Sequence, residues 1–153
     1  MRAFVWAVEG TWKATVSAAG ALLPADTEMT LLYVASTEAE TVARGALQGL
    51  LGRPRTATAQ PLNARSDQSS HDLLSSAQNL LGRQTACVMR HGRIEREVVA
   101  AAAGMDVLVL ARDGDRKHPG PRSLGPAARF VVDHAPCAVL LVWPDFLLSS
   151  GQD

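Results

Sequence analysis

The sequence predicts an α/β protein built on a five-stranded, parallel, doubly wound sheet. Three observations lead to this prediction. Five short apolar, β-prone runs alternate along the chain with segments of helical periodicity, as in repeated strand–helix–strand units. These runs lack polar alternation, which is typical of parallel strands covered on both faces. A length of 153 residues suits one domain with a substantial core.

Each predicted strand is a short run of aliphatic and aromatic residues. The first, Ala3–Val8, ends at a turn that contains Glu9 and Gly10, and the second reads MTLLYV. Right-handed crossovers between such runs give a parallel sheet with helices on both faces. The five strands are expected at residues 3–8, 29–34, 85–89, 107–110 and 137–143.

The predicted helices are bounded by capping residues, glycines and prolines. Thr11 is the expected N-cap of the first helix, and residues 37–40 (Thr-Glu-Ala-Glu) have the spacing of a capping box. Ser69 or Ser70 is expected to cap the third helix. The segment 53–67 has two prolines and little periodicity, so a loop or short linker is predicted there. The helices are expected at residues 12–23, 37–51, from Ser69 or Ser70 to 81, 94–103 and 127–133.

Composition and charge narrow the class of function. The formal net charge is zero, with 15 basic and 15 acidic residues, so a general surface for nucleic acid or anionic membrane is not favoured. No apolar run has the length needed to cross a bilayer. The apolar N-terminal run breaks at Glu9-Gly10, unlike that of a signal peptide. We therefore expect a cytoplasmic protein that binds neither nucleic acid nor membrane.

The residue types that support catalysis or metal binding are scattered. Cys87 and Cys137 each lie in a strand-like run and are expected to be buried, reduced thiols. The four histidines lack metal-ligand spacing, so no metal site is predicted. Asp113, Asp115 and His118 could form a metal or acid–base set, but carboxylates in a proline-broken loop are far more often solvated. No nucleophile–base–orienter set is visible, and no catalytic residue is predicted.

Several common α/β sites are excluded by the residues they require. The turn after the first strand has one glycine, whereas a dinucleotide-binding Rossmann motif needs G-x-G-x-x-G. The chain contains no G-x-x-x-x-G-K-[ST] phosphate loop and no G-x-S-x-G nucleophile elbow. A receiver domain would need paired acidic residues after the first strand and a late lysine, but Lys117 is the last lysine.

Four segments resemble the universal stress protein family and together span nearly the whole chain. FVWAVEGT resembles the family's opening strand and turn, and TLLYV is similar to its second strand. Gly92, a helix and then GMDVLVLA resemble the family's glycine, helix and Ala-Asp-hydrophobic strand. The most specific segment is LGPAARFVVDHAPCAVLLVWP, which resembles the family's Leu-Gly-Ser, last helix, His-Ala-Pro-Cys-Pro-Val and last strand. The resemblance implies the adenine nucleotide alpha-hydrolase-like fold of universal stress proteins.

The resemblance also implies a nucleotide crevice. Many family members bind ATP through a loop of the form G-x-x-G-(nine residues)-G-[S/T], whose backbone amides approach the phosphates. In this chain Ala111 replaces the first glycine, ten residues separate Gly114 from Gly125, and Pro126 replaces the hydroxylated residue. Glu9 stands in place of the family's aspartate. The candidate nucleotide-binding residues are Ala7, Val8, Glu9, Val34, Ala111, Arg112, Gly114, Gly125, Pro126 and Ala127.

Two functions remain open at this point. Loss of a backbone donor and a hydroxyl at Pro126 favours a non-enzymatic, homodimeric stress-response or regulatory protein with a degenerate nucleotide site. The alternative is a working module for ATP, AMP or a cyclic nucleotide, in which basic side chains of the 111–126 loop bind phosphate. A slow ATP hydrolase is the least supported, because the transferred phosphate lacks its usual cradle and the sequence offers no dedicated metal ligands. The basic residues are Arg112, Arg116, Lys117, His118 and Arg122.

The last strand predicts how the protein assembles. One domain is expected over residues 1–145, followed by a tail at 146–153. In the expected strand order 3-2-1-4-5, the apolar run Cys137–Trp143 lies at a sheet edge, where an uncovered strand promotes aggregation. The resemblance implies that two protomers pair these strands antiparallel in a homodimer. In the alternative, the tail with Phe146, Leu147 and Leu148 folds over its own edge.

Overall fold

The strands form one sheet of the expected order. In the computed structural model, which describes residues 1–37, 62–114 and 124–145, five strands pair in the order β3-β2-β1-β4-β5. Every neighbouring pair is parallel, so the predicted doubly wound architecture is confirmed. The strands are β1 (Arg2–Trp6), β2 (Glu28–Ser36), β3 (Ala86–Gly92), β4 (Val107–Ala111) and β5 (Ala138–Val142).

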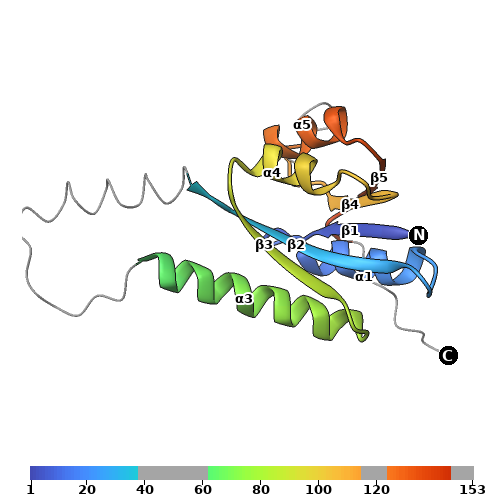
Figure 1. Ribbon diagram of the computed structural model, residues 1–153, viewed down its shortest axis with the longest axis horizontal. Helices are drawn as coiled ribbons and strands as arrows, with labels where there is room; N and C mark the ends of the chain where they lie inside the picture. The colour runs from blue at the N-terminus through green and yellow to red at the C-terminus, as the bar shows by residue number, and fades with distance from the viewer. Residues whose placement is uncertain (38–61, 115–123, 146–153) are drawn as a thin grey trace, which may run out of the picture.

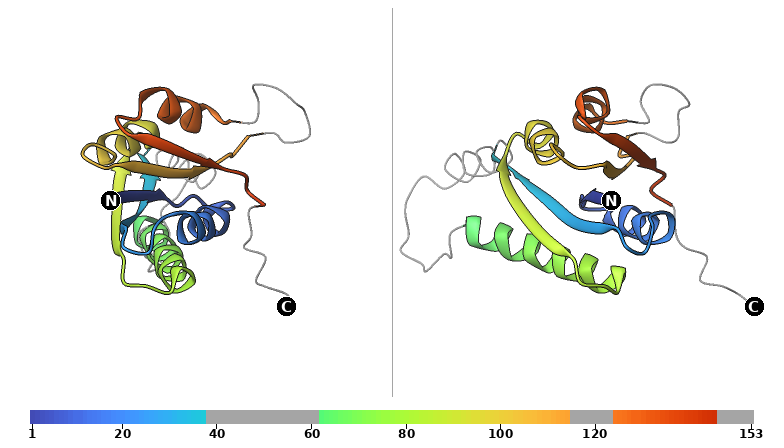
Figure 2. Two further views of the ribbon diagram at one scale, coloured as in Figure 1. Left: turned by 90° about the vertical axis from the view of Figure 1, so that its right-hand side faces the viewer. Right: turned by 45° about the vertical axis from the view of Figure 1, so that its right-hand side comes forward.

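Helices cover both faces of the sheet. Helices α1 and α3 lie against one face, and α4 and α5 lie against the other (Figures 1 and 2). This arrangement follows from right-handed crossovers that leave β1 toward one edge of the sheet and then return toward the other. The described helices are α1 (Trp12–Leu22), α3 (Leu62–Leu81), α4 (Ile94–Ala101) and α5 (Pro126–His134).

The strands divide the core into two clusters, one on each face. All five residues of β4 are buried, because β1 and β5 pair with its two edges and helices cover both faces of the sheet. Val107 and Val109 belong to the cluster beneath α1 and α3, whereas Leu108 and Leu110 belong to the cluster beneath α4 and α5. This alternation is the period of two expected for side chains along a strand.

The two N-terminal tryptophans contribute to these clusters. Trp6, which is 4% exposed, lies in the cluster beneath α4 and α5. Trp12 is partly buried and packs on the opposite cluster, with the Lys13 Nζ 5.7 Å from its ring centroid. Packing, rather than stacking against a ligand base, is therefore the role that both indoles have in the fold.

The third helix begins earlier than the sequence predicted. Helix α3 starts at Leu62, so the loop expected over 53–67 is wrong for residues 62–67. Ser70 is not an N-cap but lies within the helix, where it is 2% exposed. The sequence signal was weak because the first two turns of α3 are largely polar and show little apolar periodicity. The helix expected at 37–51 falls almost entirely outside the described residues.

The other helix boundaries agree with the sequence to within about two residues. Thr11 is the N-cap of α1, although its side chain makes no capping hydrogen bond. Gly82 follows α3 with a φ of 67°, and Gly104 follows α4 after a short turn with a φ of 79°. Both conformations favour glycine because a side chain would be strained there. These glycines therefore mark the chain reversals that the sequence predicted.

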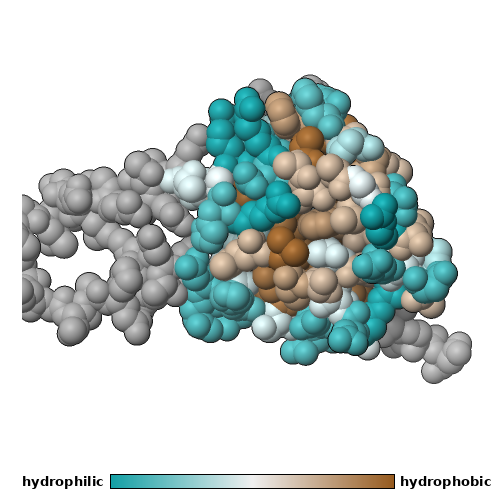
Figure 3. Space-filling view, viewed as in Figure 1, coloured by the Kyte–Doolittle hydropathy of each residue, from teal (hydrophilic) through white to brown (hydrophobic). Residues whose placement is uncertain are grey.

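The cysteines differ from the sequence prediction. Cys87 is exposed and Cys137 is partly exposed, and neither forms a disulfide. The reason for Cys87 is that β3 is an edge strand, with Ala86 also exposed and Val88 only partly buried. Apolar colour gathers in the middle of the face seen in Figure 3, where β3 crosses the molecule (Figure 1). An apolar run can thus be a strand without being buried on both sides.

Within the described ranges, no helix is both long enough and apolar enough to span a membrane.

Candidate functional site

The candidate site lies where the central strands end. Beyond the last residue of β1, the amide of Ala7 still donates to the carbonyl of Leu32 on β2, at 2.8 Å. Beyond β4, the amide of Arg112 donates to the carbonyl of Val142 on β5, also at 2.8 Å. Because β1 and β4 are parallel neighbours, their carboxyl ends lie at the same edge of the sheet. The sheet therefore brings the loop after β1 and the loop after β4 together.

The apolar candidates are part of the core at this edge. Ala7 and Ala111 are 1% and 7% exposed, respectively. Val34, 6% exposed, belongs to the cluster beneath α4 and α5, and Val8 and Ala127 pack against that same cluster. Val8, Val34 and Ala127 thus share one core cluster on the α4 and α5 side of the sheet. Their packing role would be the same with or without a ligand.

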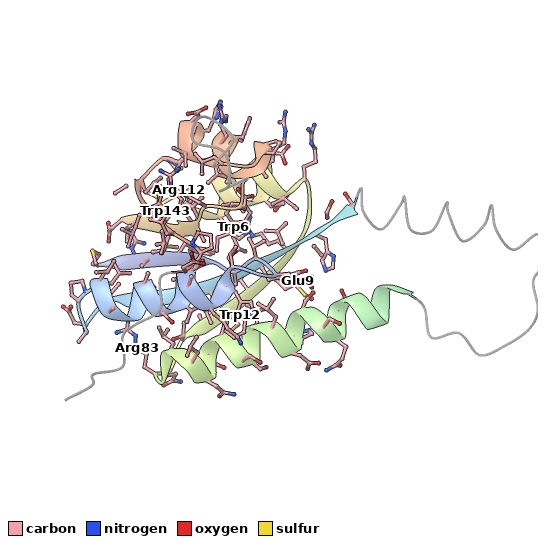
Figure 4. All side chains as sticks on the ribbon, turned by 180° about the vertical axis from the view of Figure 1, so that it is seen from behind. Trp6, Glu9, Trp12, Arg83, Arg112 and Trp143 are labelled. Carbon is pink, nitrogen blue, oxygen red and sulfur yellow. The ribbon has the colours of Figure 1, made fainter. Side chains whose placement is uncertain are left out.

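Glu9 lies on the turn between β1 and α1. Its side chain is exposed, and the following residue, Gly10, has a φ of 82°. The amides of Thr11 and Trp12 both donate to the carbonyl of Val8, at 3.1 and 2.9 Å, which closes the turn. The turn holds Glu9 at the rim of the site, with its carboxyl group exposed (Figure 4).

The start of α5 carries the most specific feature of the site. Gly125 is the N-cap, in an extended conformation (φ −65°, ψ 166°), and Pro126 is the first helical residue. The amide of Gly125 donates to the Oδ1 of Asp113, 2.7 Å away. A Cβ atom at position 125 would lie 2.8 Å from Oδ2 and 2.9 Å from Oδ1 of that carboxylate. A carboxylate of the protein itself thus occupies the N-terminus of α5.

The side chain of Arg112 contacts Trp143, the residue that follows the neighbouring strand β5. Its guanidinium carbon lies 4.6 Å from the ring centroid of Trp143, within the range of a cation–π contact. Trp143 directly follows β5 and is 53% exposed. Figure 4 shows this pair side by side, with Glu9 apart from it. The other basic residues of the predicted cluster, Arg116, Lys117, His118 and Arg122, lie outside the described residues.

A family model described as the universal stress protein family matches residues 2–142. The chain belongs to this family. The match covers all nine described helices and strands, including both sides of the candidate site.

Solved structures share the universal stress protein fold with this chain. The hypothetical protein MJ0577 is 16% identical with a TM-score of 0.66, and the match covers 93% of this chain and 94% of that one. UspA from Lactobacillus plantarum is 17% identical with a TM-score of 0.57, covering 93% and 97%. A universal stress protein in complex with cAMP is 13% identical with a TM-score of 0.62, covering 93% and 96%. A comparison with curated proteins finds no match.

The universal stress protein loop pattern can now be placed on this geometry. Ala111 is the last residue of β4, and Gly114 follows it by three residues, one residue after Asp113. Gly125 and Pro126 form the start of α5, so both ends of the loop lie at one edge of the sheet. The two ends are joined by the hydrogen bond between Asp113 and Gly125. Residues 115–123 lie between them, outside the described residues.

Neither cysteine is activated, and Cys137 directly precedes β5, at the edge of the sheet opposite the candidate site. Burial raises the pKa of Cys137, and the carboxylate of Asp106 raises that pKa further. Burial also raises the pKa of Cys87. Both thiols are therefore protonated at neutral pH, which makes them poor nucleophiles. In the part of the chain that the structure describes, no three His, Cys, Asp or Glu side chains are grouped as metal ligands.

Two residues of the site were not identified as site residues by the sequence. The sequence indicates Asp113 only as a member of a possible metal or acid–base set, and nothing in its spacing from Gly125 predicts a hydrogen bond across the loop. The sequence places Trp143 at the end of the last predicted strand and indicates no contact with Arg112. The resemblance indicates both ends of the loop. Asp113 directly precedes Gly114, the second glycine of the pattern, and this position is the one sequence signal that points to Asp113.

Proposed function

We propose that this universal stress protein is a non-enzymatic stress-response or regulatory protein that acts as a homodimer and has a degenerate nucleotide site. One observation carries the proposal: Pro126 stands at the first position of α5, directly after the N-cap Gly125. Proline is well suited to this position of a helix, because its missing amide would have no partner within the helix. At a phosphate site, however, proline provides neither a backbone N–H nor a side-chain hydroxyl to bind the phosphate.

The size of this loss can be estimated. The family pattern has serine or threonine where this chain has Pro126, so both a backbone N–H and a hydroxyl are missing. A hydrogen bond to a charged group contributes about 1.5–3 kcal/mol. Losing two would weaken phosphate binding by roughly a hundredfold or more. Ala111 adds a Cβ atom at the first glycine of the pattern, and this residue is already only 7% exposed.

The homodimer is supported by the outer edge of β5. This strand ends the sheet, and among the described residues only β4 pairs with it. Val139, Leu140 and Leu141 are partly exposed, and Trp143 beyond them is 53% exposed. An apolar edge strand of this kind favours pairing with another strand, and a second copy can supply the same strand about a twofold axis. We also place the protein in the cytoplasm, which its two free cysteines favour.

Calorimetric titration of the purified wild-type protein tests the proposal. We expect no binding of ATP, AMP or cyclic AMP in the micromolar range, with or without magnesium. We also expect no phosphate release from ATP above the background without protein. Micromolar binding would contradict the degenerate site, and magnesium-dependent phosphate release would contradict the non-enzymatic role.

A second candidate function is a working nucleotide-binding module that uses the 111–126 loop. It is favoured by the likeness of the fold to a universal stress protein in complex with cAMP, which has a TM-score of 0.62. In that case ATP, AMP or a cyclic nucleotide would be held by side chains such as Arg112 rather than by amides of α5. The titration separates the two candidates, because only the second predicts saturable binding.

A further inference from the structure

The contact between Asp113 and Gly125 affects ligand binding in a way that is separate from the donors missing at Pro126. We infer that Asp113 is a specificity-determining residue: its carboxylate takes the place of a ligand phosphate at the start of α5 and so excludes phosphate-bearing ligands from the crevice. This inference rests on the proposed function, since it names a cause of the degenerate site. It attributes the exclusion of phosphate-bearing ligands to the side chain of Asp113 as well as to the donors missing at Pro126.

The geometry shows that the two residues fit each other. The Gly125 amide donates to Oδ1 of Asp113 at 2.7 Å, a distance typical of a charge-assisted hydrogen bond. The backbone at Gly125 has a φ of −65°, which every residue type can adopt, so its conformation does not require glycine. A Cβ atom there would instead lie within 3.0 Å of both carboxylate oxygens. The space that a phosphate would need beside this glycine is thus filled by Asp113.

Electrostatics favours the carboxylate and opposes a second anion. The N-terminus of a helix carries a partial positive charge, which stabilises an acidic side chain placed there. A ligand phosphate would have to displace Asp113 from the amide and then remain close to its negative charge. Because the carboxylate is part of the chain, it competes at a high effective concentration. Together we expect these effects to weaken phosphate binding by roughly tenfold.

The inference predicts that restoring the family residue at position 126 is not sufficient. We expect Pro126→Ser alone to recover only part of the affinity for AMP, because Asp113 still occupies the amide of Gly125. The double variant Asp113→Ala with Pro126→Ser should bind AMP roughly tenfold more tightly than Pro126→Ser alone. Calorimetric titration with AMP measures this gain. Titration with adenosine, which has no phosphate, shows whether the gain depends on the phosphate. Affinity for adenosine should be the same in both variants.

Two further variants act as controls. Asp133→Ala, combined with Pro126→Ser, removes one exposed acidic side chain from the same helix α5 without touching Gly125, and we expect no gain for AMP. Asp113→Asn keeps the size of the side chain and removes its charge, so an intermediate gain is expected. It also provides a second variant if Asp113→Ala weakens the fold. Thermal unfolding of each variant shows which of them remain folded.

The outcomes separate this inference from the proposed function. If Pro126→Ser alone binds AMP as tightly as the double variant, or if neither Asp113 variant gains affinity for AMP, the role of Asp113 is refuted. An equal gain for adenosine would refute it too, because the effect would not depend on phosphate. Micromolar binding of AMP by the wild type refutes the proposed function instead. In that case Asp113→Ala alone tests the role of Asp113. The variant should bind AMP more tightly than the wild type, with an unchanged affinity for adenosine, and no such selective gain would refute the role.

Discussion

Replacing Leu108 with alanine is expected to lower the free energy of unfolding by about 3 kcal/mol, within the usual range for buried leucines. Leu108 is fully buried in β4, between β1 and β5. It lies opposite Phe4 of β1 and belongs to the cluster beneath α4 and α5. Alanine would leave a cavity between the sheet and helices α4 and α5, and a close-packed core relaxes only partly around such a cavity.

Urea unfolding followed by tryptophan fluorescence measures this loss, and the buried Trp6 provides a signal within the same cluster. Leu80→Ala is the matched control, because Leu80 is 49% exposed on α3 and should lose well under half as much. Equal losses in the two variants would contradict the arrangement of the core, and so would a change confined to the slope of the transition.

Replacing Trp143 with aspartate is expected to dissociate the proposed homodimer, raising its dissociation constant by roughly a hundredfold or more. Trp143 is 53% exposed at the end of the edge strand β5, so a partner strand would bury a large aromatic surface there. Aspartate removes this surface in both copies and places two carboxylates near the interface. The monomer should remain folded, because Trp143 lies beyond the last paired residue of β5.

Analytical ultracentrifugation over a range of concentrations measures the equilibrium. Leu80→Asp adds the same charge at an exposed leucine of α3, on a different element, and should leave the dimer intact. A wild type that sediments as a monomer at all concentrations would contradict the proposed dimer. A Trp143→Asp dimer as stable as the wild type would show that the contact lies elsewhere.

Most of the fold could be predicted from the sequence, because a buried parallel strand has a strong local signal. The run Val107–Ala111 is apolar throughout, and the structure buries all five residues. The start of α3 was missed because its first turns are largely polar, so no apolar stripe distinguishes them from a loop. The exposure of Cys87 depends on β3 being an edge strand; the expected order 3-2-1-4-5 implied that position, but the apolar run alone predicts a buried thiol.

The candidate site could be predicted only as a location. The resemblance placed Gly125 and Pro126 at the start of the last helix, and the structure agrees. The hydrogen bond from Gly125 to Asp113 joins residues twelve positions apart and depends on how the loop returns to the sheet. The contact between Arg112 and Trp143 requires β4 and β5 to be neighbours. Such contacts come from tertiary structure, which no motif in the chain encodes.

The amide of Gly125 is expected to be unavailable to a nucleotide. Heteronuclear NMR of the wild-type protein during titration with ATP observes this amide directly. We predict that its signal shows no saturable shift up to millimolar ATP, because the N–H remains bonded to Asp113. Saturable shifts of Gly125 at micromolar ATP, together with shifts of Glu9 and Val34, would contradict the claim and show that the crevice binds nucleotide.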